Sequence, residues 1–557
     1  MKKHPLLLII CLTIHISQAN AQTPFLTRDS ININNINATV MVHGDMWWDK
    51  DFNSFIFNSK CSFPNGSQKS IFFASSIWLS AIDNSGQLHV SSQTYRQSGN
   101  DYWPGPLDAS DTLTYATSHD WAKIWKINKS DIDAFLGLST HSVSTTPMSI
   151  LTWPGKGNPF AVGNGGAALS ITTDMAPFVD VNGDGIYDPV LGDYPDIKGD
   201  QALWWVFSDN GSTHDHSNGK KLGIEIHALS YAWNRGTDID NSIFYEYDLL
   251  NKSTNNYTNF RLAQWADAEL GYYYDDFIGF DSARRMAIVY NGTQDDGLNA
   301  GHPLDSYGLN PPQAAISIVY SPGDGLTSQV PAGSFTTYNN DFSSIGTPTI
   351  DSNCYNYMHS RLENGKSIAW NRRHGTAPCG GFDSMADIKY LYPDDPSNPK
   401  GWSECSCGNM PGNRRFIIST SDFTMNAGDR QKVVLALIAA DSAGGCPGTN
   451  FDKIKTVADT AHNAYRRAAS HTPVIPPKSI PHAYPNPAHD YLYLETGGKT
   501  INAESISIIN SIGQKIPCEP ILSSNKYTIN ILFLPCGVYS LLYQMDGKTQ
   551  NALFIKQ

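Results

Sequence analysis

Glutamate is scarce in this sequence of 557 residues. The chain has 44 aspartates but only 8 glutamates, and no glutamate precedes Glu225. Aspartate favours turns and loops that bind hard cations, whereas glutamate favours helices, so few helices are expected. The length exceeds that of one ordinary domain. The composition therefore predicts a mainly β, multidomain protein with β-sandwich-like folding and long loops.

Long apolar runs are also missing. Residues 6–16 form an apolar run that is too short to span a membrane, and no later segment approaches the ~18 residues required. Because Lys2 and Lys3 precede this run and Ala19-Asn20-Ala21 follows it, residues 1–21 are predicted to be a signal peptide. The net charge of −13 argues against nucleic acid as a partner. We therefore expect a secreted protein with no transmembrane segment.

The common catalytic motifs are absent: the sequence contains no HExxH, GxSxG, P-loop or GxGxxG after a strand. His214, His216 and His227 could be read as a metal cluster, but the first two lie in a polar loop. A glycosidase would need two facing carboxylates, and the early glutamates, Glu225, Glu246 and Glu269, do not select a pair. No catalytic residue is assigned, and a non-enzymatic protein is favoured over a secreted hydrolase that acts on glycans.

Tryptophan side chains could stack on sugar rings, although most such residues pack in protein cores. Trp204 and Trp205 are adjacent in a predicted strand, so their side chains must point to opposite faces of a sheet. At most one of them can be exposed. The other candidates are Trp47, Trp48, Trp103 and Trp265.

The most ordered motif is DVNGDGIYD at residues 180–188. Short oxygen-bearing side chains alternate along it, and Gly185 permits the sharp turn that brings a backbone carbonyl into the same shell. Leu191 stands where an EF-hand has its bidentate Glu, so a helix–loop–helix site is excluded. The pattern predicts a calcium site, against the alternative of a solvated acidic turn. Its expected ligands are Asp180, Asn182, Asp184, Ile186, Asp188 and Asp193.

A second acidic cluster follows at residues 265–281. It could form another calcium site, complete the first, or be a polar loop, and the sequence does not decide between these. Its carboxylates are Asp267, Glu269, Asp275, Asp276 and Asp281.

Eight cysteines remain after the predicted leader, which removes Cys11. An even number in an exported chain favours disulfides, and no pattern with zinc spacing is present. Disulfides are expected within the group from Cys354 to Cys446, with connectivity undetermined.

Strand patterns dominate the chain from residue 71 onwards. A hairpin is predicted at 71–96, and strands at 201–207, 223–233, 243–251, 260–264, 314–320, 416–420 and 432–440. Helices are predicted only at 129–138 and 450–469. The predicted β-rich body covers residues 22–470, either as one unit or as two units of about 22–265 and 266–470. A proline-rich spacer at 471–480 separates it from a compact β unit at 481–557.

This terminal unit has about seven short strands, which is typical of an immunoglobulin-like β-sandwich. It resembles the type A C-terminal sorting domain of proteins exported by the type IX (Por) secretion system. The resemblance rests on Tyr484-Pro-Asn-Pro487, Ile508-Ile-Asn-Ser-Ile-Gly-Gln514, Leu534-Pro-Cys-Gly-Val-Tyr539 and Phe554-Ile-Lys556. The body is similar to an uncharacterised cargo type of the same system, through 95–96, 102–106, 180–201, 265–281 and 311–312.

The resemblance implies passage through the periplasm and an outer-membrane translocon that reads residues 481–557. The protein would then be attached to the cell surface or released. Cys536 stands where the family has a small residue, so a local disulfide with Cys518 is an open alternative. The expected function is that of a calcium-stabilised binding, adhesion or structural protein, with a glycan or surface ligand.

Overall fold

The structure is a computed structural model, and it describes most of the chain. The predicted signal peptide and the predicted spacer at 471–480 lie outside the described residues, as does Cys379. The described ranges are 27–49, 61–97, 99–297, 306–325, 328–338, 346–368, 388–442, 444–470, 482–495, 501–523, 526–545 and 548–557.

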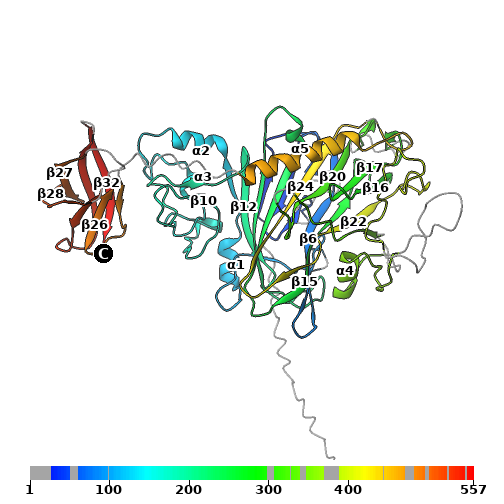
Figure 1. Ribbon diagram of the computed structural model, residues 1–557, viewed down its shortest axis with the longest axis horizontal. Helices are drawn as coiled ribbons and strands as arrows, with labels where there is room; N and C mark the ends of the chain where they lie inside the picture. Colours follow the sequence, from blue (N-terminus) through cyan, green and yellow to red (C-terminus); the bar gives the residue numbers. More distant parts are fainter. Residues whose placement is uncertain are drawn as a thin grey trace, which may run out of the picture.

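The body contains an antiparallel sheet of eleven strands (Figure 1). Its central pair is β6 and β15, whose register places Trp265 opposite Ser76. The predicted hairpin is present, because β7 pairs with β6 around the Asp83–Gly86 turn. The strands are β1 (Arg28–Ile31), β2 (Asn37–Met41), β3 (Asp45–Met46), β4 (Cys61–Ser62), β5 (Ser70–Phe72), β6 (Ala74–Asp83), β7 (Leu88–Ser91), β15 (Tyr257–Ala268), β21 (Ser334–Tyr338), β22 (Arg414–Ser419) and β23 (Phe423–Met425).

A second antiparallel sheet has nine strands, with β12, β13, β14 and β24 at its centre. These four strands have apolar residues on both faces because both faces are covered. The strands are β8 (Trp103–Pro104), β9 (Trp125–Asn128), β12 (Gln201–Ser208), β13 (Ile224–Ala232), β14 (Ser242–Asn251), β16 (Asp276–Asp281), β17 (Met286–Asn291), β20 (Gln313–Tyr320) and β24 (Arg430–Ala440). Two short hairpins stand outside the sheets: β10 (Phe178–Val179) with β11 (Tyr194–Pro195), and β18 (Asp295–Asp296) with β19 (Gly308–Leu309).

Three apolar cores set the layer order of the body. The largest lies between the two sheets and contains, for example, Leu79 from β6 and Trp205 from β12. A second core covers the other face of the nine-stranded sheet, where α5 (Asp452–Ala469) crosses β20 and β24 (Figure 1). A third covers the outer face of the eleven-stranded sheet, under α4 (Asp351–Met358). The body is therefore a β-sandwich with helical cover on both sides.

The helices are few and peripheral, as the composition predicts. Both predicted helices are present, as α2 (Lys129–Leu136) and α5. The others are α1 (Tyr115–Trp121), α3 (Met148–Leu151), η1 (Asn164–Gly166) and η2 (Asp238–Asn241), in addition to α4.

The division of the body at residue 265 is wrong. The proposed boundary falls inside β15, and each sheet combines strands from both sides of it. β14, for example, pairs with β24 along its length. Hydrophobic patterning locates strands but does not identify the strands they pair with. The sequence therefore could not show that each sheet combines strands from both sides of residue 265.

Residues 482–557 form a separate two-sheet β unit with its own core. One sheet contains β25 (His482–Tyr484), β26 (Tyr491–Glu495), β29 (Ile521–Ser523) and β30 (Lys526–Asn530). The other contains β27 (Ile501–Asn510), β28 (Lys515–Ile516), β31 (Gly537–Met545) and β32 (Lys548–Lys556). Leu492 and Ile508 of the two sheets share this core, in agreement with the predicted sandwich.

The cysteines follow the prediction only in part. Cys405 and Cys446 form a disulfide, with their Cα atoms 5.9 Å apart, and Cys407 is also disulfide-bonded. Cys354 is not: its buried thiol lies 3.2 Å from the Ser92 hydroxyl. Cys518 and Cys536 are free thiols, so the local bridge considered for them is absent.

Candidate functional site

The predicted calcium motif forms the tip of the β10–β11 hairpin. This hairpin belongs to a lobe, residues 129–200, that the chain builds between β9 and β12. Within the loop, Asp180 Oδ1 accepts a hydrogen bond from Gly183 N at 2.6 Å, and its Oδ2 accepts one from Gly185 N at 2.8 Å. Gly185 has a φ of +78°, the left-handed conformation that the tight turn requires. The carboxylate of Asp180 thus holds the loop closed.

Asp193, at the end of the loop, is hydrogen-bonded to the start and to the middle of the loop. Its buried carboxylate accepts hydrogen bonds from Val181 N and Asp188 N, both at 2.8 Å. Burial raises the pKa of Asp193 to about 8 and also raises the pKa of Asp188. Within the ranges that the structure describes, no group of three or more His, Cys, Asp or Glu side chains is arranged as a metal site. A cation here would therefore also need amide or backbone carbonyl oxygens, which calcium accepts.

The carboxylates of the second acidic cluster do not all lie at one place in the structure. Asp267 lies on β15. Its Oδ2 accepts a hydrogen bond from the Tyr95 hydroxyl at 2.5 Å and forms an ion pair with Arg415 at 3.2 Å. Asp281 pairs with Arg284 at 2.9 Å. Glu269, Asp275 and Asp276 occupy the turn between β15 and β16, and Asp296 of β18 joins them.

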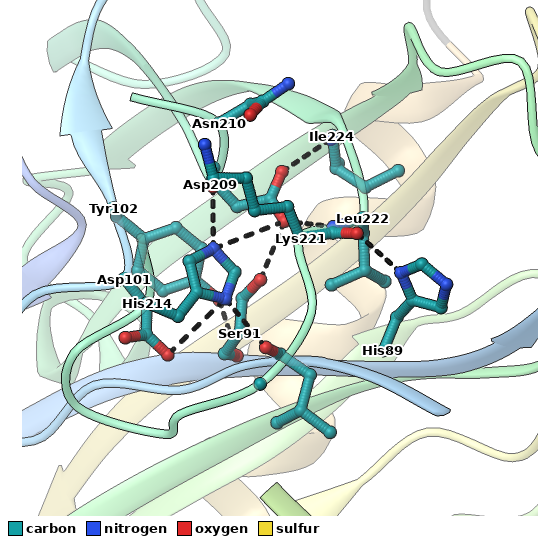
Figure 2. Close-up of polar contacts among 12 residues, drawn as sticks. His89, Ser91, Asp101, Tyr102, Asp209, Asn210, His214, Lys221, Leu222 and Ile224 are labelled. Atoms are coloured by element: carbon teal, nitrogen blue, oxygen red, sulfur yellow. Dashed lines mark hydrogen bonds and ion pairs between the residues drawn. The ribbon is translucent and has the colours of Figure 1, made fainter. Parts of the chain in front are cut away.

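The three histidines are not a metal cluster. Figure 2 shows His214 with its ring nitrogens directed at two backbone carbonyls, those of Val90 at 2.8 Å and Asp209 at 2.7 Å. His227 lies on β13 and contacts Glu225, with Nε2 2.7 Å from Oε1. His214 therefore links its own loop to β7 and to the end of β12, whereas His227 lies on β13 and contacts Glu225.

The tryptophans do not offer sugar-stacking platforms. Trp47, Trp103, Trp204, Trp205 and Trp265 are all buried, and only Trp48 of the six candidates is partly exposed. Trp204 and Trp205 do point to opposite faces of β12, as predicted, because they belong to different cores.

A polar cavity of about 350 Å³ lies on the outer face of the nine-stranded sheet, beside the base of the β10–β11 hairpin. Strands β12, β13, β14 and β24 supply its floor, and the lobe supplies its wall. Its lining residues are Asp174, Met175, Ala176, Pro177, Phe178, Asp196, Lys198, Trp204, His227, Leu229, Glu246, Asp248, Arg430 and Lys432.

Glu246 is held between two lysines in this pocket. Its Oε2 lies 2.9 Å from Lys198 Nζ, and its Oε1 contacts Lys432 Nζ. Burial alone would raise the pKa of Glu246, but the two ammonium groups bring this pKa below its ordinary value. Beside it, Asp248 pairs with Arg430 at 2.5 Å. Glu246 is therefore an ionised counter-ion of the two lysines.

His227 presents the one unpartnered ring nitrogen of this pocket within the described residues. Its Nε2 faces Glu225, while its buried Nδ1 has no hydrogen-bond partner there. Glu225 also accepts a hydrogen bond from Leu107 N at 2.8 Å. Burial would raise the pKa of Glu225, but the contact with His227 lowers it overall.

The sequence analysis considered Trp204, His227 and Glu246 without assigning them to a site, and it did not consider Lys198, Arg430 and Lys432. A signal was present: β14 and β24 each carry two charged residues spaced two apart, which places them on one face of otherwise apolar strands. Without knowledge that β14 pairs with β24, these charges could not be assigned to one pocket.

Comparisons with known proteins concern mainly the end of the chain. Residues 482–557 match the family model of the secretion system C-terminal sorting domain. No curated protein matches the chain. A solved structure of a polysaccharide lyase aligns at 8% identity over 60% of this chain, which spans only 34% of that structure. With a TM-score of 0.17, this likeness carries no argument about fold or activity.

No helix in the described part of the chain is both long and apolar enough to cross a membrane. The strand content of residues 482–557, their separate core and the family match agree with one another. Residues 482–557 are a type IX secretion C-terminal sorting domain, and the chain is a cargo that this system exports for secretion or attachment to the cell surface.

Proposed function

We propose that the body is a non-catalytic binding module and that its ligand site is the pocket around Glu246. The observation that carries this proposal is the double ion pair of Glu246 with Lys198 and Lys432. A glycosidase needs one carboxylic acid that keeps its proton near neutral pH. Because its pKa is lowered, Glu246 is ionised at that pH and cannot act as this acid.

The pocket chemistry suits a saccharide. Lys198, Lys432 and Arg430 offer hydrogen-bond donors, with side chains 24%, 38% and 44% exposed. The less exposed carboxylates of Glu246 and Asp248 hold these donors in place. Sugar hydroxyls both donate and accept, so they match a lining of charged donors and acceptors. The cavity volume lies at the lower end of the ~300–1,000 Å³ typical of small-ligand sites.

The test is a glycan-binding screen of the mature chain, followed by calorimetry and product analysis on each hit. Arg430→Gln is expected to weaken binding about tenfold, because it removes a charged hydrogen-bond donor. Arg235→Gln is the matched control, since Arg235 pairs with Asp200 at 3.0 Å outside the pocket and is similarly exposed. Equal affinities for the two variants would rule out this pocket, and cleavage products would favour the alternative, a secreted glycan hydrolase.

We also propose that calcium at the 180–193 loop stabilises the wall of this pocket. Support comes from the oxygen-rich turn and from its place at the tip of the hairpin whose base lines the cavity. The expected ligands remain Asp180, Asn182, Asp184, Asp188, the carbonyl of Ile186 and Asp193.

Calcium is therefore expected to raise the thermal unfolding midpoint of the mature chain. The gain is ~2.7 kcal/mol at a hundredfold excess over the dissociation constant. Asp184→Asn should remove most of this response, whereas Asp180→Asn would damage the turn itself, since Asp180 accepts several backbone hydrogen bonds. Asp133→Asn, at an exposed pair with Lys129, is the control. An identical calcium response in Asp184→Asn would contradict calcium binding at this loop.

A further inference from the structure

Four oxygen-bearing side chains converge where the chain passes from the eleven-stranded to the nine-stranded sheet. Asp275 and Asp276 follow the turn after β15, and Asn291 at the end of β17 lies directly opposite Asp276 in the strand register. Cross-strand partners have their side chains on the same face. Asp296 of β18 completes the group, because its carboxylate is close enough to influence the pKa of both Asp275 and Asp276.

Four of the seven side-chain oxygen atoms in this group accept hydrogen bonds from backbone donors. Asp276 Oδ2 accepts a hydrogen bond from Leu270 N at 3.1 Å, and Asp275 Oδ2 accepts one from Gly297 N at 2.9 Å. Asp296 accepts hydrogen bonds from Tyr272 N and Tyr307 N. These bonds fix the orientation of all three carboxylates.

One side-chain oxygen of each of the first three residues is not used by these backbone donors. Asp275 Oδ1, Asp276 Oδ1 and Asn291 Oδ1 are buried and have no hydrogen-bond partner among the described residues. Asp276 is 0% exposed and Asn291 is 1% exposed. Leaving such groups unpaired away from water is costly.

Charge compensation is also weak here. Burial, followed by repulsion from Asp275, raises the pKa of Asp276 well above its ordinary value. Burial likewise raises the pKa of Asp296 to about 7, although the backbone hydrogen bonds from Tyr307 and Tyr272, and then Lys69, act in the opposite direction. The nearby guanidinium of Arg414 already pairs with Glu404 at 2.8 Å. Among the described residues, the cluster has no ion pair with a basic side chain.

We propose that this cluster is a calcium site, with Asp275 Oδ1, Asp276 Oδ1 and Asn291 Oδ1 as ligands. All three donors are hard oxygens, two of them carboxylate, and no imidazole or thiolate takes part, which favours calcium over zinc. The set needs only two carboxylates because the amide supplies the third oxygen. Backbone carbonyls or waters would complete the shell.

An ion bound by these residues would connect β16 and β17 of the nine-stranded sheet to the turn that follows β15 of the eleven-stranded sheet. β15 belongs to the eleven-stranded sheet and β16 to the nine-stranded sheet, and the turn between them carries Asp275. This turn is also tied to β5, since Gly271 N donates a hydrogen bond to Ser70 O at 2.9 Å. The site is independent of the 180–193 loop.

The test is terbium luminescence of the mature chain, with calcium as competitor. The ring centroids of Tyr272, Tyr273 and Tyr274 lie 4.2 to 6.1 Å from one another. These rings are next to Asp275 in the chain and can sensitise a bound terbium ion. The titration is made with the Asp184→Asn variant, which weakens the proposed site at the 180–193 loop. A terbium signal in this variant therefore reports on the cluster around Asp276, whatever the 180–193 loop binds. We expect a calcium-displaceable signal to remain there.

Adding Asp276→Asn to that background should weaken terbium binding at least about tenfold, because a carboxylate ligand is lost while the bond to Leu270 N is kept. Without calcium, this variant should unfold at the same or a higher temperature, since it removes a buried charge. Asp281→Asn, which affects the pair with Arg284, should leave terbium binding unchanged. The proposal is overturned if no displaceable signal remains in Asp184→Asn, or if Asp276→Asn leaves that signal intact.

Discussion

Removal of residues 482–557 is expected to leave the rest of the chain folded but held in the periplasm. The removed segment is the type IX sorting domain, and its strands pair only with one another among the described residues. Its core, which includes Leu492, Ile529 and Phe554, shares no residue with the cores of the body. The deletion therefore removes the export signal without exposing the core of the body.

The measurement is fractionation of cells that express the full chain or the truncated chain. The expected change is nearly complete: the full chain appears outside the cell and the truncated chain does not. A reporter with a signal peptide, fused to residues 482–557, should be exported, whereas the same reporter without the fusion should stay in the periplasm. Surface exposure of the truncated protein would refute the assignment of export to this domain.

Asp209→Ala is expected to lower the free energy of unfolding of the body by ~3–5 kcal/mol, because each buried donor left without an acceptor costs ~1–3 kcal/mol. Asp209 is fully buried after β12 (Figure 2). Its carboxylate accepts hydrogen bonds from Ser91 Oγ at 2.8 Å, Leu222 N at 2.6 Å and Ile224 N at 2.7 Å. The substitution leaves three buried donors without an acceptor.

Ser91→Ala is the matched control. It removes only one of the three donors, so a loss of ~1 kcal/mol is expected. Denaturant unfolding followed by tryptophan fluorescence reports on the body alone, because all 13 tryptophans precede residue 403. If Asp209→Ala cost no more than Ser91→Ala, the carboxylate would not be the centre of this network.

Local sequence patterns were sufficient to predict most of the central strands and the longest helix. Alternation and apolar runs located β12, β13, β14, β20 and β24, because burial on a sheet face is a local requirement on each strand. The helical spacing of Ile454, Val457 and Ala461 located α5 in the same way. The prediction at residues 260–264 covered only part of β15. β16 was missed because its carboxylates suggested a loop, and β17 was also missed.

The sites were harder to predict because they depend on strand pairing. Asp267 and Asp281 are close to Asp275 in sequence, but the structure places them with Arg415 and Arg284. Asn291 comes to the cluster only because β16 and β17 pair in one particular register. The loop at 180–193 could be predicted as a calcium site, which stays a prediction, because all its candidate ligands lie in one short segment of the chain.

The pairing of β14 with β24 has a consequence for how this protein folds. Ser242 lies opposite Ile438, so the centre of the nine-stranded sheet closes only after almost the whole body has been synthesised. Such a high contact order makes folding slow, since loop-closure entropy is lost before the distant contacts form. Strand edges stay open in the meantime, which exposes the nascent chain to aggregation and chaperone binding. An N-terminal half of the body therefore cannot complete either large sheet alone, and we expect the body to fold as one cooperative unit.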